Sequence, residues 1–448
     1  MNDTFEGLDR AVADGNLSRR QMLWLMATAS GGIVLSGCAV NPVTGKREFS
    51  LMGQAQEVEI DRQHSPHQFS ADYGISQDAA LRSYVASVGR DIARVSHRPD
   101  MPYSFNPVNA NYINAYAFPG GTIGVTRGIM LEMDSEAELS ALLGHEVAHV
   151  TARHTAQRMS KQQLTGLVLA GAGAVVAARA GESQAALAMG LGGVAAGLLL
   201  ARYSREDERQ ADSLGMEYMA KAGQNPEGMV KLMDLLRAQS SRQPGMLEQM
   251  FSSHPMSDER YANMKQEQQR RYAQHANRSL NRERYMDNTA ALRRLKPAIE
   301  LQQQAETALR GDKFTDAEQL LARSLERAPQ DYTGLVLMAK TLMIQEKNTQ
   351  ARPYLDRAIA VYPEEAQAHH LAGVASLHAG QPGAALERFQ SYDQLLPGNP
   401  NTRFFIGLSH EGLGERDHAA QAFREYLQMG GSGQQADYAR QRLASWQG

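Results

Sequence analysis

The chain is poor in cysteine, in net charge and in apolar runs long enough to cross a membrane. Its 448 residues include one cysteine, Cys38, which excludes an intrachain disulfide and a thiolate metal site, so any metal must be held by His, Asp or Glu. The net charge is only −3, which gives no reason to expect a nucleic acid partner. Its apolar runs fall short of the roughly 20 residues that a comfortable span needs.

The start of the chain reads as a targeting segment. Residues 18–37 are SRRQMLWLMATASGGIVLSG, in which Arg19-Arg20 resembles a twin-arginine export signal. The following LSGC resembles a bacterial lipobox, in which Cys38 is lipidated and becomes the first mature residue. The alternative is a membrane anchor or buried helix, which the short apolar run disfavours. We therefore expect a signal peptide over 1–37.

The residue after the lipobox predicts the destination. Ala39, rather than aspartate, follows Cys38, and by similarity to enterobacterial sorting rules this favours the outer membrane. Two or more acyl chains anchor a protein stably. The expected location is the periplasm of a Gram-negative bacterium, with a lipid anchor in the outer membrane.

Residues 112–159 change from strand to helix character. YINAYAFPGGTIGVTR (112–127) predicts a strand, a tight Pro-Gly-Gly turn and a partner strand. Ser135 and Glu138 form a capping-box pattern, so a helix is expected from about 135 to about 159. Apolar residues recur on one face of this helix, which predicts that part of it faces inward.

Residues 164–201 are rich in Ala, Gly and Leu and contain two short apolar runs. A membrane hairpin is conceivable, but length favours a buried or lid-like helical pair. The same shortness argues against an integral-membrane prenyl-protein peptidase.

The last third of the chain is a repeat. Ala317, Ala351, Ala385 and Ala419 recur at one constant interval, and Pro329, Pro363 and Pro397 keep the same interval. The interval matches the period of about 34 residues that is typical of tetratricopeptide repeats. Small residues where two helices cross and a proline after each helix pair are also typical of these repeats. Such arrays form a solenoid that binds peptides or partner proteins.

The stretch LLGHEVAHV (142–150) carries the candidate chemistry. His145 and His149 lie four residues apart, about 40° around a helix, and can bind one metal ion. Glu146 lies about 100° from His145, close enough to activate a water molecule without being a ligand. Imidazole ligands suit Zn²⁺. Because the motif is short, satisfied core histidines remain an alternative.

A third ligand strengthens the zinc hypothesis. In YSREDERQADSLG (203–215), Glu208 can complete a His₂Glu site, and Asp212 can hydrogen-bond a ligand histidine and fix its tautomer. The alternative is a surface charge cluster. His154 is about 140° off the ligand face of a continuous helix and is excluded. His64 and His67 are interpreted as surface residues.

These motifs resemble one family. HEVAH (145–149), ERQAD (208–212) and NAYAFPGG (114–121) are similar to the gluzincin peptidases that include HtpX and the CAAX prenyl proteases. The repeats make the chain resemble the periplasmic branch that joins such a peptidase to tetratricopeptide repeats. The resemblance implies one Zn²⁺ per chain on His145, His149 and Glu208, Glu146 as general base, and Asp212 as support.

The resemblance also singles out one histidine in a loop. His254 in FSSHPMSDER (251–260) matches a family histidine that sits near the metal, where it keeps the peptidase latent or stabilises the transition state. Without the resemblance, His254 is an ordinary loop residue before Pro255.

The strand Asn114-Ala115-Tyr116-Ala117 is a candidate substrate-binding element. An exposed strand edge can hold an extended peptide by backbone hydrogen bonds, which gives affinity with little sequence specificity. This suits an enzyme that cleaves misfolded segments.

The sequence therefore predicts a mostly α protein. A metallopeptidase domain with a small β-sheet (38–285), a charged helical connector (286–300) and an α-solenoid of repeats (301–448) follow the signal peptide. We expect a zinc endopeptidase that cleaves misfolded or stalled outer-membrane proteins, with repeats that dock clients or the assembly machinery. The alternative is a chaperone or scaffold whose zinc site is largely latent.

Overall fold

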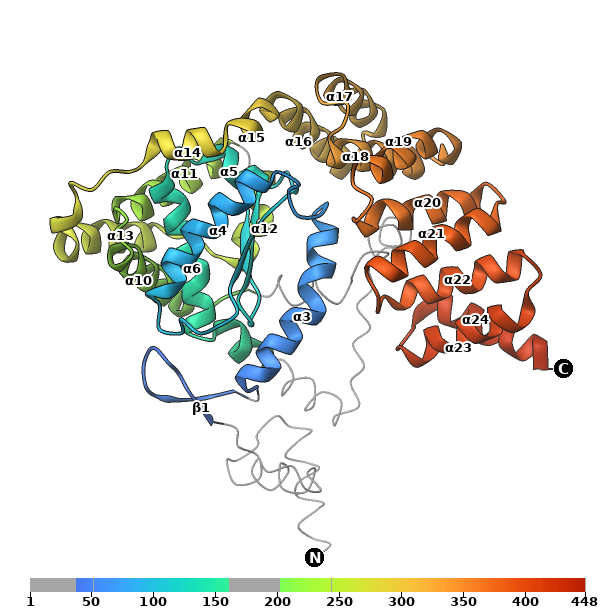
Figure 1. The fold of residues 1–448 in the computed structure, drawn as a ribbon, viewed down its shortest axis with the longest axis horizontal. Helices are drawn as coiled ribbons and strands as arrows, with labels where there is room; N and C mark the ends of the chain where they lie inside the picture. The colour runs from blue at the N-terminus through green and yellow to red at the C-terminus, as the bar shows by residue number, and fades with distance from the viewer. Residues whose placement is uncertain (1–37, 51, 161–201, 243, 448) are drawn as a thin grey trace, which may run out of the picture.

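A computed structural model describes residues 38–50, 52–160, 202–242 and 244–447. The expected signal peptide (1–37) and the expected helical pair (164–201) lie outside the described residues. We call residues 38–294 the N-terminal domain and residues 296–447 the repeat array. Figure 1 shows the two side by side, with helix α3 (Gln54–Ala71) of the N-terminal domain facing the array.

The N-terminal domain contains a small three-stranded sheet. Its strands β3 (Ser104–Val108), β4 (Ala115–Ala117) and β5 (Thr122–Thr126) are arranged in the order β3-β5-β4. β4 runs antiparallel to β5, as the sequence predicted, and the turn between them places Gly121 at φ +108°. A separate pair of strands, β1 (Cys38–Val40) and β2 (Arg47–Phe49), begins the described chain. In the three-stranded sheet, the order β3-β5-β4 places β4 at one edge.

Helix α6 (Glu136–Thr151) is the centre of this domain, and all its residues are buried. The Ser135 hydroxyl accepts from the Glu138 amide, and the Glu138 carboxylate accepts from the Ser135 amide, so the predicted capping box is present. Three helices surround α6: α4 (Ala79–Arg94), α10 (Arg205–Lys221) and α11 (Glu227–Arg242).

The prediction that this helix continues to residue 159 is wrong. Arg153 has a left-handed backbone, with φ +61°, which separates α6 from the helical residues 154–160. The Arg153 side chain donates to the Glu57 carboxylate at 2.7 Å and to the Met52 carbonyl at 2.6 Å. These buried contacts with a distant segment stabilise the break.

Short helices complete the domain and lead to the array. They are α5 (Arg127–Glu132), α12 (Pro244–Ser253), α13 (Asp258–Arg271), the 3₁₀ turn η1 (Ala273–His275), α14 (Arg282–Asn288) and α15 (Ala290–Arg294). In Figure 1, α14 and α15 connect the domain to the array. No helix in the described ranges is long and apolar enough to cross a membrane.

The repeat array consists of antiparallel helix pairs. Its helices are α16 (Lys296–Arg310), α17 (Phe314–Arg327), α18 (Tyr332–Ile344), α19 (Asn348–Val361), α20 (Ala366–His378), α21 (Pro382–Leu395), α22 (Pro400–Gly412), α23 (Arg416–Gln428) and α24 (Gly433–Gln447). Helices α17, α19, α21 and α23 begin at the predicted constant interval, with Phe314, Asn348, Pro382 and Arg416. The alanines of the predicted period are fully buried. The mostly α architecture with a solenoid is therefore confirmed, and its first helix begins inside the expected connector.

Polar contacts join the array to the N-terminal domain. Arg127, at the start of α5, pairs with Asp331 at 2.7 Å and donates to Gln302 at 2.5 Å. The Ser70 hydroxyl, near the end of α3, donates to the Glu365 carboxylate. These side chains are buried, so the two parts share a desolvated polar interface.

Candidate metal centre

Four potential metal ligands converge where α6 meets α10. His145 and His149 project from α6, Glu208 from α10, and His254 follows α12. Their ligand atoms all lie within 4.8 Å of one another, and all four side chains are buried. His149 Nε2 lies 3.1 Å from His145 Nε2 and 3.3 Å from Glu208 Oε1. His254 Nδ1 lies 2.9 Å from the same carboxylate oxygen.

Two glycines allow the helices to approach this closely. A Cβ atom on Gly215 of α10 would lie 2.9 Å from the backbone nitrogen of His145, and one on Gly144 of α6 would lie 3.0 Å from the Gly215 carbonyl oxygen. Both neighbours are backbone atoms that cannot rotate away. The close crossing places the ligand of α10 opposite the two ligands of α6.

Asp212 lies one turn beyond Glu208 and holds the other nitrogen of His145. Its Oδ1 is 3.0 Å from His145 Nδ1. A carboxylate in this position accepts the Nδ1–H proton and leaves Nε2 free as a metal ligand. This geometry corresponds to the role expected of Asp212.

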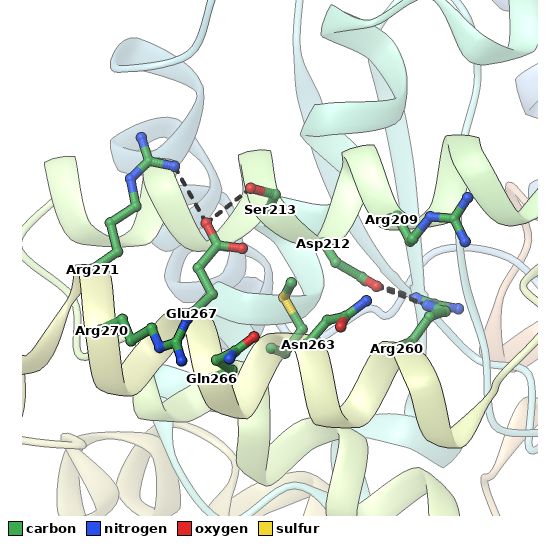
Figure 2. Close-up of a pocket in the computed structure, with 10 residues that line it drawn as sticks. Arg209, Asp212, Ser213, Arg260, Asn263, Gln266, Glu267, Arg270 and Arg271 are labelled. Atoms are coloured by element: carbon green, nitrogen blue, oxygen red, sulfur yellow. Dashed lines mark hydrogen bonds and ion pairs between the residues drawn. The ribbon is translucent and has the colours of Figure 1, made fainter.

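Arg260 of α13 forms ion pairs with both carboxylates, those of Asp212 and Glu208. Its guanidinium donates to Asp212 through two bonds of 2.7 Å and to the Pro255 carbonyl at 2.8 Å. Its Nη1 also lies 2.5 Å from Glu208 Oε2, as a close ion pair without hydrogen-bond alignment. Figure 2 shows Asp212 and Arg260 meeting across the groove between α10 and α13.

Sequence reasoning missed Arg260, Tyr203 and the contact of His154. The Tyr203 ring stacks on His149 at a centroid distance of 3.9 Å. His154 stays outside the ligand cluster, but its Nδ1 lies 2.9 Å from His149 Nδ1. The helix break at Arg153 permits this contact. No signal in one sequence distinguishes Arg260 from its exposed arginine neighbours. His154 is excluded as a ligand only if the helix is continuous, and the break at Arg153 changes its direction.

Glu146 is fully buried beside this cluster, and neither carboxylate oxygen has a hydrogen-bond partner among the described residues. The nearest basic group in an ion pair with it is His254, whose Nε2 lies 3.9 Å from Glu146 Oε1. Burying an unpaired carboxylate is costly, so such a group indicates a site for a missing partner. A water molecule and a cation bound among the four potential ligands would supply this partner for Glu146.

The environment shifts the pKa values of the two glutamates in opposite directions. Burial raises the pKa of Glu146, and Glu208 adds to the effect, while His254 and His145 oppose it. Burial also opposes ionisation of Glu208, but His254, His149 and His145 outweigh it and hold its pKa well below the usual range. Burial keeps the pKa of His149 well below its ordinary value, so this ring is neutral, as a metal ligand must be.

The donor set fits a transition-metal ion. Imidazoles with one carboxylate are typical zinc ligands, and a ligand histidine usually donates its other ring N–H to a carboxylate, as His145 does to Asp212. The chemistry of these side chains and the unpartnered Glu146 therefore agree with a metal bound by His145, His149 and Glu208. His64 and His67 lie on α3, outside the cluster.

The candidate substrate strand is next to this cluster but is not exposed. Asn114, Ala115, Tyr116 and Ala117 are all at least 95% buried, which corrects the expectation of an open edge. The space along β4 has a volume of only about 10 Å³, and its other lining residues are Gln68 of α3, Tyr203, Gln249, Ser253 and His254. Residues of α3 and of the end of α12 therefore cover this edge.

Comparisons with known proteins agree with this geometry. Residues 79–268 match the model of Peptidase family M48, and residues 336–400 match a Tetratricopeptide repeat model. The beta-barrel assembly-enhancing protease of Yersinia pestis is 26% identical over 391 residues, which cover 82% of this chain and 80% of that protein.

Two relatives from Escherichia coli (strain K12) match shorter parts. Its beta-barrel assembly-enhancing protease is 28% identical over 49% of this chain and 45% of that protein. Its metalloprotease YcaL is 25% identical over 53% of this chain and 93% of that protein. A family M48 domain implies a metal cofactor. A match to peptidase family M48 over residues 79–268 is thus followed by a match to tetratricopeptide repeats, and this combination indicates a metalloprotease.

Proposed function

We propose that this protein is a zinc endopeptidase of the periplasm that cleaves misfolded or stalled outer-membrane proteins. The observation that carries the proposal is the convergence of His145, His149 and Glu208 beside the buried, unpartnered Glu146. The relatives named beta-barrel assembly-enhancing protease support the choice of client class.

In the proposed mechanism, His145, His149 and Glu208 would hold Zn²⁺, which would supply a Lewis acid for peptide hydrolysis. Glu146 accepts a proton from the attacking water and passes it to the leaving amine. Burial raises the pKa of Glu146 and so makes it a better base. Asp212 fixes the orientation of His145, and Arg260 fixes Asp212.

The backbone of Asn114–Ala117 is proposed to pair with an extended client segment. β4 is the edge strand of its sheet and lies along the same small space as His254. Because that edge is covered, substrate entry requires the elements that line the space to move apart. The repeats would dock the client or the outer-membrane assembly machinery, in line with the peptide-binding role of such arrays.

We also propose a lipid anchor on Cys38, which would hold the enzyme at the periplasmic face of the outer membrane. The LSGC sequence supports this assignment. Metabolic labelling with a fatty acid should tag the parent and not Cys38→Ala, and equal labelling of both would contradict the anchor.

The test of the mechanism is Glu146→Gln, assayed with unfolded casein and for bound zinc. We expect cleavage to fall at least ~100-fold, since general base catalysis contributes that much or more, while zinc content stays at the parent value. Glu206→Gln, on the exposed face of α10, is the control and should cleave normally. Near-parent turnover by Glu146→Gln would contradict the proposed mechanism.

One observation favours a second candidate, a chaperone or scaffold with a largely latent peptidase. His254 lies within the ligand cluster, and a fourth protein ligand closes a zinc site against water. If His254→Ala raises casein cleavage, the residue keeps the enzyme latent. If the substitution lowers cleavage, His254 takes part in catalysis, and latency through this residue is excluded.

A further inference from the structure

A second group of potential metal ligands lies far from the candidate active centre, at the turn between α22 and α23. His410 is in the last turn of α22, Glu415 precedes α23, and His418 is in its first turn. The ligand atoms of these three side chains all lie within 4.8 Å of one another. His410 Nδ1 is 2.6 Å from Glu415 Oε2, and His418 Nδ1 is 3.6 Å from the same oxygen.

The fold of the turn does not require these side chains. In the α22–α23 turn, the Glu415 amide donates to the His410 carbonyl at 2.9 Å. The equivalent backbone bond, also 2.9 Å, closes each of the three preceding turns of the array, where the pairs are Gln381–Ser376, Lys347–Leu342 and Lys313–Ala308. The ordinary alternative, that His410 and Glu415 serve only to close the turn, therefore leaves their identity unexplained.

The ligand set is also confined to this repeat. The equivalent positions one repeat earlier are Ser376, Gln381 and Ala384, and those two repeats earlier are Leu342, Lys347 and Gln350. Neither set contains a histidine or a carboxylate. The histidine–glutamate–histidine triad thus lies on a turn that is closed by the same backbone hydrogen bond as the three preceding turns.

We propose that His410, Glu415 and His418 bind a divalent transition-metal ion, with Zn²⁺ as the best-suited candidate. Ligand atoms about 2.0–2.2 Å from a tetrahedral ion lie roughly 3.4 Å apart, so the His410–Glu415 contact needs to open by less than about 1 Å. Two imidazoles and one carboxylate match Zn²⁺ and leave a coordination position for water. The C-terminal end of α22 carries a partial negative charge and the N-terminal end of α23 a partial positive charge. The two offset each other, so the side chains determine which ion the site prefers.

The bound ion would link α22 to α23 at the end of the array. Repeats are stabilised by contacts with their neighbours. A metal that joins the two helices would add a direct link within this helix pair. This inference concerns the repeat array alone and does not depend on the proposed peptidase mechanism.

The experiment measures Zn²⁺ bound by the full chain, without a polyhistidine tag, by equilibrium dialysis and elemental analysis. The parent is compared with His418→Gln, which removes an exposed ligand, and with His378→Gln, which removes an exposed histidine of the preceding repeat. We expect the parent and His378→Gln to bind one more equivalent than His418→Gln. Casein cleavage by His418→Gln should equal that of the parent, which separates this site from the active centre.

Amide hydrogen exchange shows where the additional Zn²⁺ ion binds. Zn²⁺ should slow amide exchange in α22 and α23 of the parent but not of His418→Gln, because the ion links these two helices. Equal zinc content in the parent and His418→Gln would overturn the proposal. Loss of the extra equivalent in both variants would also overturn it, because it would indicate non-specific binding to surface histidines.

Discussion

At the scale of single residues, the candidate centre depends on a buried relay from Arg260 through Asp212 to His145. The spacing within HEVAH and ERQAD predicted that each pair of side chains shares a helical face, because i and i+4 fix a common face, and the structure brings these side chains together. Arg260 could not be assigned in the same way. It reaches the relay from a helix 48 residues further along the chain, and only the tertiary packing of α13 on α10 brings it there.

Arg260→Met should disturb both stability and metal binding. It leaves the Asp212 and Glu208 carboxylates buried with less compensation, which costs about 3–5 kcal/mol of unfolding free energy. Loss of the two hydrogen bonds that hold Asp212 against His145 should also weaken zinc affinity ~10–100-fold. Arg209→Met is the matched control, since Arg209 lines the same groove (Figure 2) but pairs only at the surface with Glu259. Denaturant unfolding and zinc competition titration measure the two effects. Equal stability and equal zinc affinity of Arg260→Met and Arg209→Met would contradict the role of Arg260.

At the scale of elements, the beginning of α6 was predictable and its end was not. Ser135 marks the beginning because its cap is completed by Glu138, three positions away. The end of α6 is decided by Arg153 and Glu57, which are 96 residues apart. For the same reason the sequence revealed the β4–β5 pair but not the elements that cover its edge, since α3 and α12 are remote from it along the chain.

The crossing of α6 and α10 should tolerate no larger residue at Gly215. Gly215→Ala places a methyl group against the backbone of His145, so the helices must separate. We expect a loss of about 1–3 kcal/mol of stability and weaker zinc binding, despite the better helix propensity of alanine. Gly383→Ala in α21 is the control, because its Cβ has room and should be neutral or slightly stabilising. A stable Gly215→Ala protein with parent zinc affinity would show that the close crossing is unnecessary.

At the scale of the whole molecule, the interface between the N-terminal domain and the array contains charges that water would otherwise solvate. Burial raises the pKa values of Asp72, Glu306 and Glu365. Lys340 lies among them with its Nζ 4.7 Å from the centre of the Tyr73 ring. Burial lowers the pKa of Lys340 to about 8, although the three carboxylates oppose this shift. The regular period of alanines and prolines predicted the array, but nothing in the period could indicate which of its faces meets the other domain.

This arrangement predicts that alkaline pH stabilises the fold through Lys340. Between the folded pKa of about 8 and the ordinary value of 10.5, the unfolded chain binds the proton more tightly, so stability rises with pH. From pH 7 to pH 9 the parent should gain about 1 kcal/mol relative to Lys340→Met in urea unfolding. Replacing the exposed Lys313 by Met should leave the pH dependence of the parent unchanged. Parallel pH profiles for the parent and Lys340→Met would contradict the role of Lys340.

The first described strand, β1, gives the proposed lipid anchor an unusual geometry. Asn41 lies only three residues after Cys38, and its buried side chain donates to the Ala152 carbonyl at the end of α6. Three residues span at most ~10 Å, so acyl chains on Cys38 would attach almost directly to the helix that carries His145 and His149. With no flexible tether, the catalytic helix would stay at a nearly constant height above the bilayer. The enzyme would then search for clients by lateral diffusion in two dimensions and reach only segments that emerge close to the membrane surface.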